Sequence, residues 1–129
     1  MRKDVENYMS SSDYDFSTAK HLLRIGRYVY VIFLCHMSLE KMLKATFSKS
    51  LNRSAPKTHN LLYLLKETNT KLPPEYFDFL SKINNASIAT RYPEDLSKLI
   101  SSFPKQVAKE YLEQTEKILV WLKQQLKSI

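Results

Sequence analysis

The sequence predicts an all-α protein, an antiparallel up-down bundle of four longer helices plus one short helix. Three observations predict it. Apolar residues recur at helical spacing through almost the whole chain. The 129 residues include a single glycine, Gly26, whereas tight hairpins favour glycine in their turns. The segments that connect the periodic stretches are short, as in antiparallel bundles. No repeat or linker divides the chain, so we expect one domain over residues 1–129.

The first two predicted helices lie on either side of that glycine. Residues 5–23 have apolar side chains at helical spacing, and Gly26 suits a left-handed stop after them. A second helix over about 28–49 is apolar on more than one side, which is typical of an element central to a bundle. Pro56 in the next segment indicates that this helix has ended.

Three further helical segments complete the predicted bundle. A short, leucine-rich helix covers about 58–65. Proline is tolerated in a first helical turn, so Pro73-Pro74 introduces a longer helix that runs to Thr90. Residues 91–95 interrupt the pattern. From Pro104 onward the chain has its cleanest amphipathic period, and we expect the last helix there.

Composition excludes several classes of protein. Phosphate-binding loops of the P-loop or dinucleotide type need several glycines, and this chain has one. One cysteine excludes an internal disulfide framework, and three widely spaced histidines match no zinc pattern, so we expect neither metal nor cofactor. No apolar run approaches the roughly 20 residues of a membrane span, and the N-terminus lacks the apolar core of a secretion signal. We therefore expect a cytoplasmic protein without a membrane segment.

The charge distribution is asymmetric. The formal net charge is +7, which permits an anionic partner such as RNA or a nucleotide without requiring one. No acidic residue lies between Glu40 and Glu67. The basic residues of that stretch are Lys41, Lys44, Lys49, Arg53, Lys57 and Lys66. They form either a solvated surface or a phosphate-binding edge beside which Tyr63 or Tyr92 stacks a base, and the sequence leaves both interpretations open.

Five short elements, in their order and spacing, resemble the HEPN domain family. They are Asp13-Tyr14-Asp15-Phe16 with Ala19 and Leu22-Leu23, Gly26-Arg27-Tyr28, the run from Phe33 to Ala45, Thr58-His59-Asn60-Leu61, and Arg91-Tyr92-Pro93. The strongest are the Glu-Lys-x-x-Lys-Ala element at 40–45 and the His-x-Leu after the loop. The resemblance implies a small helical bundle that tends to dimerise. It also implies, for many members, partnership with a small nucleotidyltransferase encoded beside them, often in toxin–antitoxin pairs. Other members are metal-independent ribonucleases, and some are linked to nucleotide binding.

The ribonuclease branch of that family is marked by an arginine, a spacer of four to six residues and a histidine. The histidine can move protons while the arginine stabilises charge on the scissile phosphate. Arg53 and His59 match this spacing. The family's motif lies late in the bundle, however, near Arg91, and residues 95–98 contain no histidine. We therefore expect no catalytic residues, with Arg53 and His59 as the alternative pair and His59 otherwise a short-helix residue that bonds locally.

The remaining candidates are ligand-binding residues. We predict that Lys41, Lys44, Arg91 and Tyr92 contact a ligand, and that no residue binds a metal. His36 falls on the apolar stripe of the second helix and is interpreted as a core histidine. Asp13 and Asp15 are candidate acceptors for Arg91 or Lys41 across the bundle, but two apart on a helix they point in different directions and make poor metal ligands.

Three hypotheses about function follow. The first is a non-catalytic HEPN-type binding module that partners a separately encoded minimal nucleotidyltransferase and contacts nucleotide or RNA. It forms a homodimer because the second helix has more apolar surface than one neighbour covers, at Val29, Tyr30, Phe33, Leu34 and Met37. The alternative is a metal-independent endoribonuclease, a HEPN toxin, that uses Arg53 and His59. The third is a helical assembly protein without a ligand.

Overall fold

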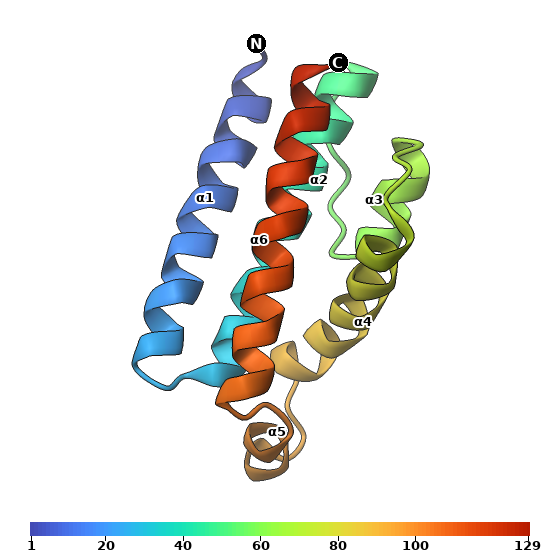
Figure 1. The fold of residues 1–129 in the computed structure, drawn as a ribbon. Coiled ribbons are helices and arrows are strands. Elements are labelled where there is room, and N and C mark those ends of the chain that lie inside the picture. The colour runs from blue at the N-terminus through green and yellow to red at the C-terminus, as the bar shows by residue number, and fades with distance from the viewer.

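The computed structural model describes residues 1–129 and contains six helices and no strands (Figure 1). The longer helices are α1 (Lys3–Arg24), α2 (Tyr28–Leu51), α4 (Pro74–Arg91) and α6 (Lys105–Lys127). The short helices are α3 (Leu61–Glu67) and α5 (Leu96–Ser102). The prediction of an all-α chain is confirmed, and the helix count is corrected by one, because α5 was not predicted. It has only seven residues and buries only Leu99, too little for an apolar period to show in the sequence.

Local sequence explains where these helices begin and end. Gly26 adopts a left-handed conformation with φ +81°, and the amide of Arg27 after it donates to the carbonyl of Leu22, which closes the turn between α1 and α2. Asn52 ends α2 with φ 50°, a conformation that asparagine tolerates. The carboxylate of Asp95 begins α5 by accepting a hydrogen bond from the amide of Lys98 at 3.1 Å.

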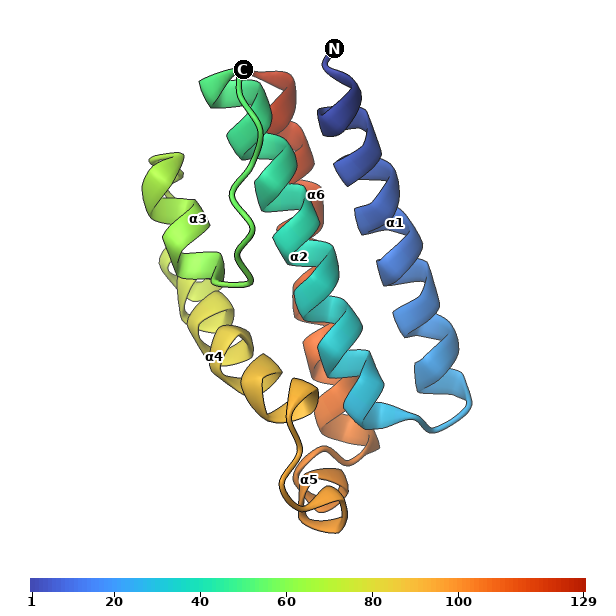
Figure 2. The ribbon, with the colours of Figure 1, turned by 180° about the vertical axis from the view of Figure 1, so that it is seen from behind.

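The three longest helices lie alongside one another. α1 and α2 run in opposite directions, and α6 packs against both (Figures 1 and 2). α3 and α4 flank α2 on the side away from α1, and α5 closes the end of the molecule opposite the two termini. The segment between α2 and α3, residues 52–60, runs back along α2 in an extended path (Figure 2). This path brings residues near the start of α3 against the middle of α2.

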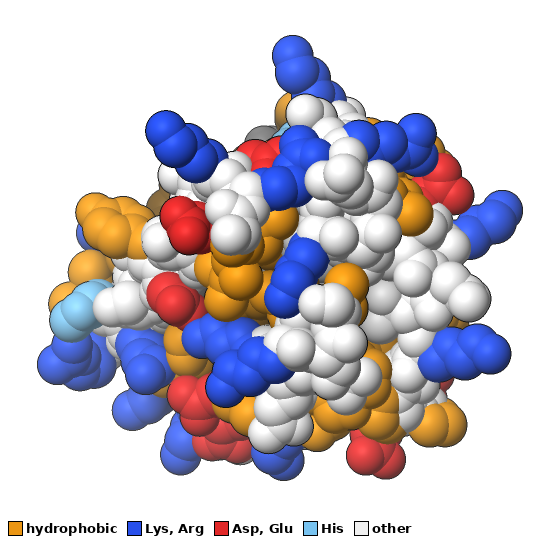
Figure 3. All heavy atoms as spheres, turned by 90° about the horizontal axis from the view of Figure 1, so that it is seen from above, with side chains coloured by type: hydrophobic (Ala, Val, Ile, Leu, Met, Phe, Trp, Pro, Cys, Tyr) orange, Lys and Arg blue, Asp and Glu red, His pale blue; other side chains and the backbone are white.

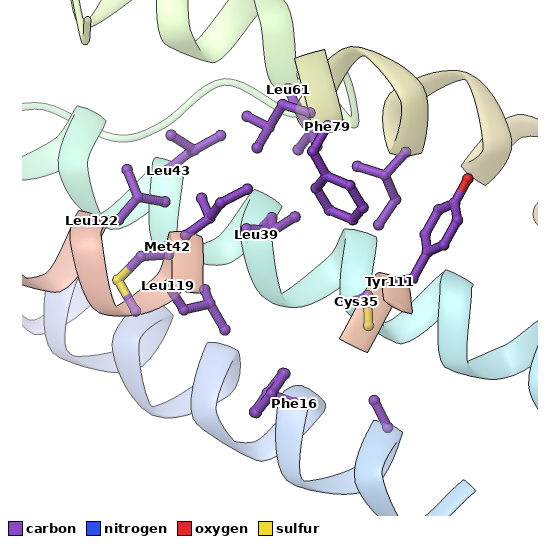
Figure 4. Packing of buried hydrophobic residues seen from close by; sticks show 14 of the residues in the cluster. Phe16, Cys35, Leu39, Met42, Leu43, Leu61, Phe79, Tyr111, Leu119 and Leu122 are labelled. Carbon is purple, nitrogen blue, oxygen red and sulfur yellow. The ribbon is translucent and has the colours of Figure 1, made fainter. Parts of the chain in front are cut away.

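The core draws apolar side chains from all six helices (Figure 4). Leu39 and Met42 of α2 are fully buried at its centre. Phe79 of α4 meets Tyr111 of α6 edge to face, with ring centroids 5.3 Å apart, which fixes α4 to the far side of the bundle. Cys35 is buried in the same cluster, and burial raises the pKa of its thiol to about 12. No helix combines the length and the apolar character that crossing a membrane requires.

Candidate functional site

Three polar side chains line one face of the central helix. His36, Glu40 and Lys44 follow each other at intervals of four residues, so they share the side of α2 that meets α3 and α4. Their exposed fractions are 0%, 2% and 8%. Buried charges are costly unless they are paired, so the partners of these groups determine what the site can do.

The carboxylate of Glu40 is the centre of a cluster of cations. Its Oε2 accepts a hydrogen bond from Nζ of Lys44 at 3.0 Å. Its Oε1 lies 2.7 Å from Nδ1 of His59, within hydrogen-bond distance. Nη2 of Arg91 lies 3.7 Å from the same Oε1. One buried carboxylate therefore faces two permanent cations and an imidazole, contributed by α2, α4 and the segment before α3.

Asparagine side chains hold His59 in this place. Oδ1 of Asn60 caps the start of α3 by accepting from two amides of its first turn. Asn84 of α4 accepts a hydrogen bond from the amide of Leu61 at 2.9 Å, and its amide group lies 3.3 Å from Oδ1 of Asn60. The start of α3 is thereby tied to α4. His59, one residue before the cap, lies against Glu40 while 59% of its side chain stays exposed.

Arg91 is the last residue of α4 and lies mainly on apolar or weakly polar groups. Its guanidinium carbon is 4.8 Å from the centre of the Phe33 ring, a cation–π contact. Its Nη2 is 3.0 Å from the sulfur of Met37, a weak acceptor. Its buried Nε has no hydrogen-bond partner within the chain. Because five N–H donors are available and few are used, Arg91 keeps donors for an additional acceptor.

His36 belongs to the core beneath this cluster and does not pair with Glu40. Its Nδ1 lies 4.0 Å from Oε1 of Glu40, and neither ring nitrogen forms a hydrogen bond in the structure. Burial, outweighing the nearby carboxylate, lowers the pKa of His36 to about 4. The imidazole is therefore neutral near pH 7. The interpretation of His36 as a buried core residue is confirmed.

A hollow opens on the solvent side of the cluster. It has a volume of about 310 Å³, and its lining includes His59, Asn60, Asn84, Arg91 and Tyr92. A second hollow of about 440 Å³, which also contains Phe33, adjoins Arg91 and Tyr92. Tyr92, which lines both hollows, is 74% exposed. No three His, Cys, Asp or Glu side chains gather where they could hold a metal ion.

Of the four predicted ligand residues, Arg91 and Tyr92 line this hollow and the two lysines do not. Nζ of Lys41 lies 2.7 Å from Oδ2 of Asp15, so its side chain faces α1. Lys44 is buried in its pair with Glu40. These contacts do not test the expectation that both lysines contact a ligand, but they favour Arg91 and Tyr92 over Lys41 and Lys44 as ligand residues. Seen from the end that carries the termini, the Lys and Arg side chains are spread over the whole face, with acidic side chains among them (Figure 3).

Arg53 and His59, the alternative catalytic pair, also have different partners in the structure. The guanidinium of Arg53 lies over the ring of Phe47, 5.3 Å from its centre, and no hydrogen bond joins it to His59. Arg91, not Arg53, shares the Glu40 carboxylate with His59. Sequence reasoning did not identify Glu40, Asn60 and Asn84 as site residues. Two sequence features pointed to them. Glu40 is a carboxylate on an otherwise apolar stripe, and Asn60 directly precedes a run of leucines.

The comparison with protein families agrees with the fold and with the order of these elements. The model of the HEPN domain matches residues 5–125. The chain belongs to the HEPN family. A search of curated proteins found no match.

Two solved structures have the same fold as this HEPN domain. TT1696 from Thermus thermophilus superposes with a TM-score of 0.82 at 19% identity, covering 95% of this chain and 98% of that one. ST0689, an archaeal HEPN homologue, superposes with a TM-score of 0.78 at 21% identity, covering 98% and 99%. At these identities the likeness concerns the fold alone.

Counted from Arg91 with a spacer of four to six residues, the ribonuclease pattern would place its histidine at 96–98, where this HEPN domain has Leu96, Ser97 and Lys98 of α5. Asp95, four residues after Arg91, uses its carboxylate to cap the start of α5. The imidazole that accompanies Arg91 is instead His59, which comes from the segment between α2 and α3.

Proposed function

We propose that this HEPN domain is a binding module that holds a phosphate group of a nucleotide or RNA at the hollow beside Arg91 and His59. The observation that carries this proposal is the excess of positive charge around Glu40. One carboxylate is shared by Lys44, Arg91 and His59. A partly buried cation without a full counter-ion is unfavourable, and an incoming phosphate would supply the missing negative charge.

The hollow also contains groups that suit the rest of a nucleotide. The exposed ring of Tyr92 offers a flat surface on which a base can stack. Asn60, at the edge of the hollow, has a side-chain NH₂ group that donates to no other atom of the chain. A guanidinium with spare donors, an aromatic platform and a free amide together fit a phosphate joined to a sugar and a base.

Titration with AMP and with a short single-stranded RNA, at low and at moderate salt, tests this proposal. Arg91→Ala should weaken binding at least tenfold, because hydrogen bonds to a charged group contribute about 1.5–3 kcal/mol. For the RNA, the slope of log affinity against log salt should fall by roughly 0.7 for each lost phosphate contact. Arg53→Ala is the matched control, since it removes the same charge from the Phe47 contact. Equal binding by Arg91→Ala and wild type would contradict the proposal.

We propose further that the protein is a homodimer formed through the α5 end. Four exposed apolar side chains line the hollows there: Tyr30, Ile88, Leu96 and Ile100. Exposed apolar patches of this kind mark protein interfaces. Lys98 lines the same hollow as the acidic pair Glu94 and Asp95, and Arg27 lines the other hollow at this end, so a two-fold axis would bring opposite charges together.

Sedimentation of the wild type and of Leu96→Asp/Ile100→Asp tests the dimer. The wild type should sediment as a dimer at tens of micromolar, and the variant as a monomer near 15 kDa, because a buried carboxylate disrupts an apolar interface. Val120→Asp, a change at an exposed apolar residue of α6, should leave the dimer intact. A monomeric wild type would exclude this assembly.

The protein partner that we propose is a separately encoded minimal nucleotidyltransferase, in a pair of the toxin–antitoxin type. Resemblance to HEPN proteins that work in such pairs supports this part. Co-expression with the product of a neighbouring nucleotidyltransferase gene should yield a complex that survives gel filtration. Separate elution of the two proteins would contradict it.

A metal-independent endoribonuclease is the second candidate function, favoured by one observation. His59 is hydrogen-bonded to a buried carboxylate and stands beside Arg91, which places a proton-transfer group next to a charge-stabilising one. If this candidate is correct, the protein cleaves single-stranded RNA in EDTA, and His59→Ala abolishes cleavage without changing the fold. We expect no cleavage, because the family's own late histidine is replaced by residues of α5.

A further inference from the structure

We propose that Glu40 is the positioning residue of this site and that it fixes the tautomer of His59. The inference rests on the proposed function for its consequence in binding, but its main test needs no ligand. It starts from the contact between Oε1 of Glu40 and Nδ1 of His59, at 2.7 Å. Glu40 is 2% exposed, so this contact is shielded from water on the carboxylate side.

The direction of the proton in this contact follows from the neighbours of Glu40. The Glu40 carboxylate pairs with the Lys44 ammonium, 3.0 Å from Oε2, and glutamate carboxylates are ordinarily ionised near pH 7. An ionised carboxylate only accepts hydrogen bonds, so a neutral His59 must carry its proton on Nδ1. Without this partner the imidazole would be free to exchange between its two neutral forms.

The tautomer determines whether Nε2 of His59, the ring atom on the ligand side, accepts or donates a hydrogen bond. In an imidazole ring Nε2 lies across from Nδ1, so a ring held through Nδ1 turns Nε2 away from Glu40. His59 lines the hollow and is more than half exposed, which directs Nε2 to the ligand side. Neutral His59 then presents an acceptor for a ligand hydroxyl, and protonated His59 presents a donor for a phosphate oxygen.

The same carboxylate acts on the second ligand residue. Nη2 of Arg91 is 3.7 Å from Oε1, within ion-pair distance but longer than a hydrogen bond. Phe33 and Met37 support the guanidinium from the other side. Glu40 therefore attracts Arg91 toward His59 without using all of its donors. A single buried carboxylate orients both groups that are proposed to hold the phosphate, while Lys44 pairs with its other oxygen.

Nitrogen-15 spectra of the imidazole rings in ligand-free protein test the tautomer directly. The wild type should show His59 protonated on Nδ1 when neutral. In Glu40→Gln the Lys44 ammonium should attract the amide oxygen, which turns the amide NH₂ toward His59 and makes Nδ1 an acceptor. We therefore expect the Nε2-protonated form in that variant. Glu67→Gln, at a glutamate whose carboxylate accepts from the Tyr63 hydroxyl, is the matched control and should leave the His59 spectrum unchanged.

A second variant keeps the test decisive if Glu40→Gln does not fold. Glu40→Gln/Lys44→Gln removes both members of the buried pair, so no uncompensated ammonium remains. The preference for protonation on Nδ1 should again be lost. A wild-type His59 that carries its proton on Nε2, or a tautomer unaffected by either variant, would overturn the inference even if AMP binds.

A double-mutant cycle with AMP measures the consequence in binding. Glu40→Gln alone and His59→Ala alone should each weaken AMP binding about tenfold. If Glu40 acts through His59, Glu40→Gln should weaken binding by a clearly smaller factor in the His59→Ala background. Fully additive losses would show that Glu40 does not act through His59. Failure of AMP to bind at all would count against the proposed function, while the spectra would still decide the role of Glu40.

Discussion

The central helix meets two different environments on its two sides. Toward α6, α2 buries apolar groups such as Cys35 and Met42, with Leu39 at the centre of the core. Toward α3 and α4 it also buries a stripe of polar groups, with Glu40 at its middle. The apolar side is stabilised by a non-directional effect that depends on area, whereas the polar side depends on the exact partners of a few atoms.

This difference indicates what each side is for. Apolar packing stabilises the fold in proportion to the area buried, and it tolerates other apolar residues of similar volume. A buried ion pair contributes little net stability compared with apolar residues of the same size, yet breaking it is strongly destabilising. A helix that needed only to hold the bundle together would gain little from Glu40 and Lys44 at buried positions. Their presence next to a hollow with a half-exposed histidine favours a functional explanation.

The largest effect is expected on the apolar side. Leu39 is fully buried among the core residues, so Leu39→Ala should lower the free energy of unfolding by about 2–5 kcal/mol through lost burial and the resulting cavity. Urea denaturation measures this change. If the variant stays folded, its affinity for AMP should remain within about twofold of wild type. A loss of stability below about 1 kcal/mol would mean that this side of α2 is not the main stabilising interface.

A slightly smaller, pH-dependent effect is expected from the polar side. Above pH 6.5, His36 is neutral in both folded and unfolded chains and contributes nothing to pH dependence. Below that value the unfolded chain binds a proton, while the folded chain, in which the pKa of His36 is about 4, does not. Stability should therefore fall as the pH drops from 6.5 to about 4, by up to about 3 kcal/mol in total.

Urea denaturation at several pH values, for wild type and His36→Gln, isolates this contribution. The variant should lose less stability than wild type over the same acid range, since it has no imidazole at this position. His21→Gln, in the exposed last turn of α1, is the control and should follow the wild-type curve. Identical curves for wild type and His36→Gln would show that His36 is accessible to protons in the folded state.

The same contrast explains which features of the structure could be predicted from the sequence alone. Apolar periodicity is a local property, so it predicted α1, α2, α3, α4 and α6 to within a few residues. The charged groups of α2 were visible too, and Asp15 was among the acceptors expected for Lys41. The partners of Glu40 on other elements, His59 and Arg91, were not predicted. Which charges converge depends on the path of the chain after α2. No pattern in a single sequence contains that information.

A smaller effect is expected where α1 approaches α2. The hydroxyl of Ser12 is fully buried and donates to the carbonyl of Ser38 at 2.7 Å. Ser12→Ala should lower the free energy of unfolding by about 1 kcal/mol, the usual net value of such a bond. Ser101→Ala removes an exposed hydroxyl that bonds within α5 and should change stability by less than about 0.5 kcal/mol. Equal effects of the two changes would place the Ser12 hydroxyl in contact with water.

The smallest effect on stability is expected at Lys41, and its effect on binding decides how far the site extends. Lys41 pairs with Asp15 at 2.7 Å, and its side chain is 26% exposed, so Lys41→Gln should change stability by only about 0.2–1 kcal/mol. Because Lys41 faces α1 while Glu40 faces α4, AMP affinity should stay within about twofold of wild type, whereas Arg91→Ala should lose at least tenfold. Isothermal titration of both variants at one salt concentration makes the comparison. If Lys41→Gln loses as much affinity as Arg91→Ala, the ligand must pull Lys41 away from Asp15, and the basic residue that sequence alone proposed belongs to the site after all.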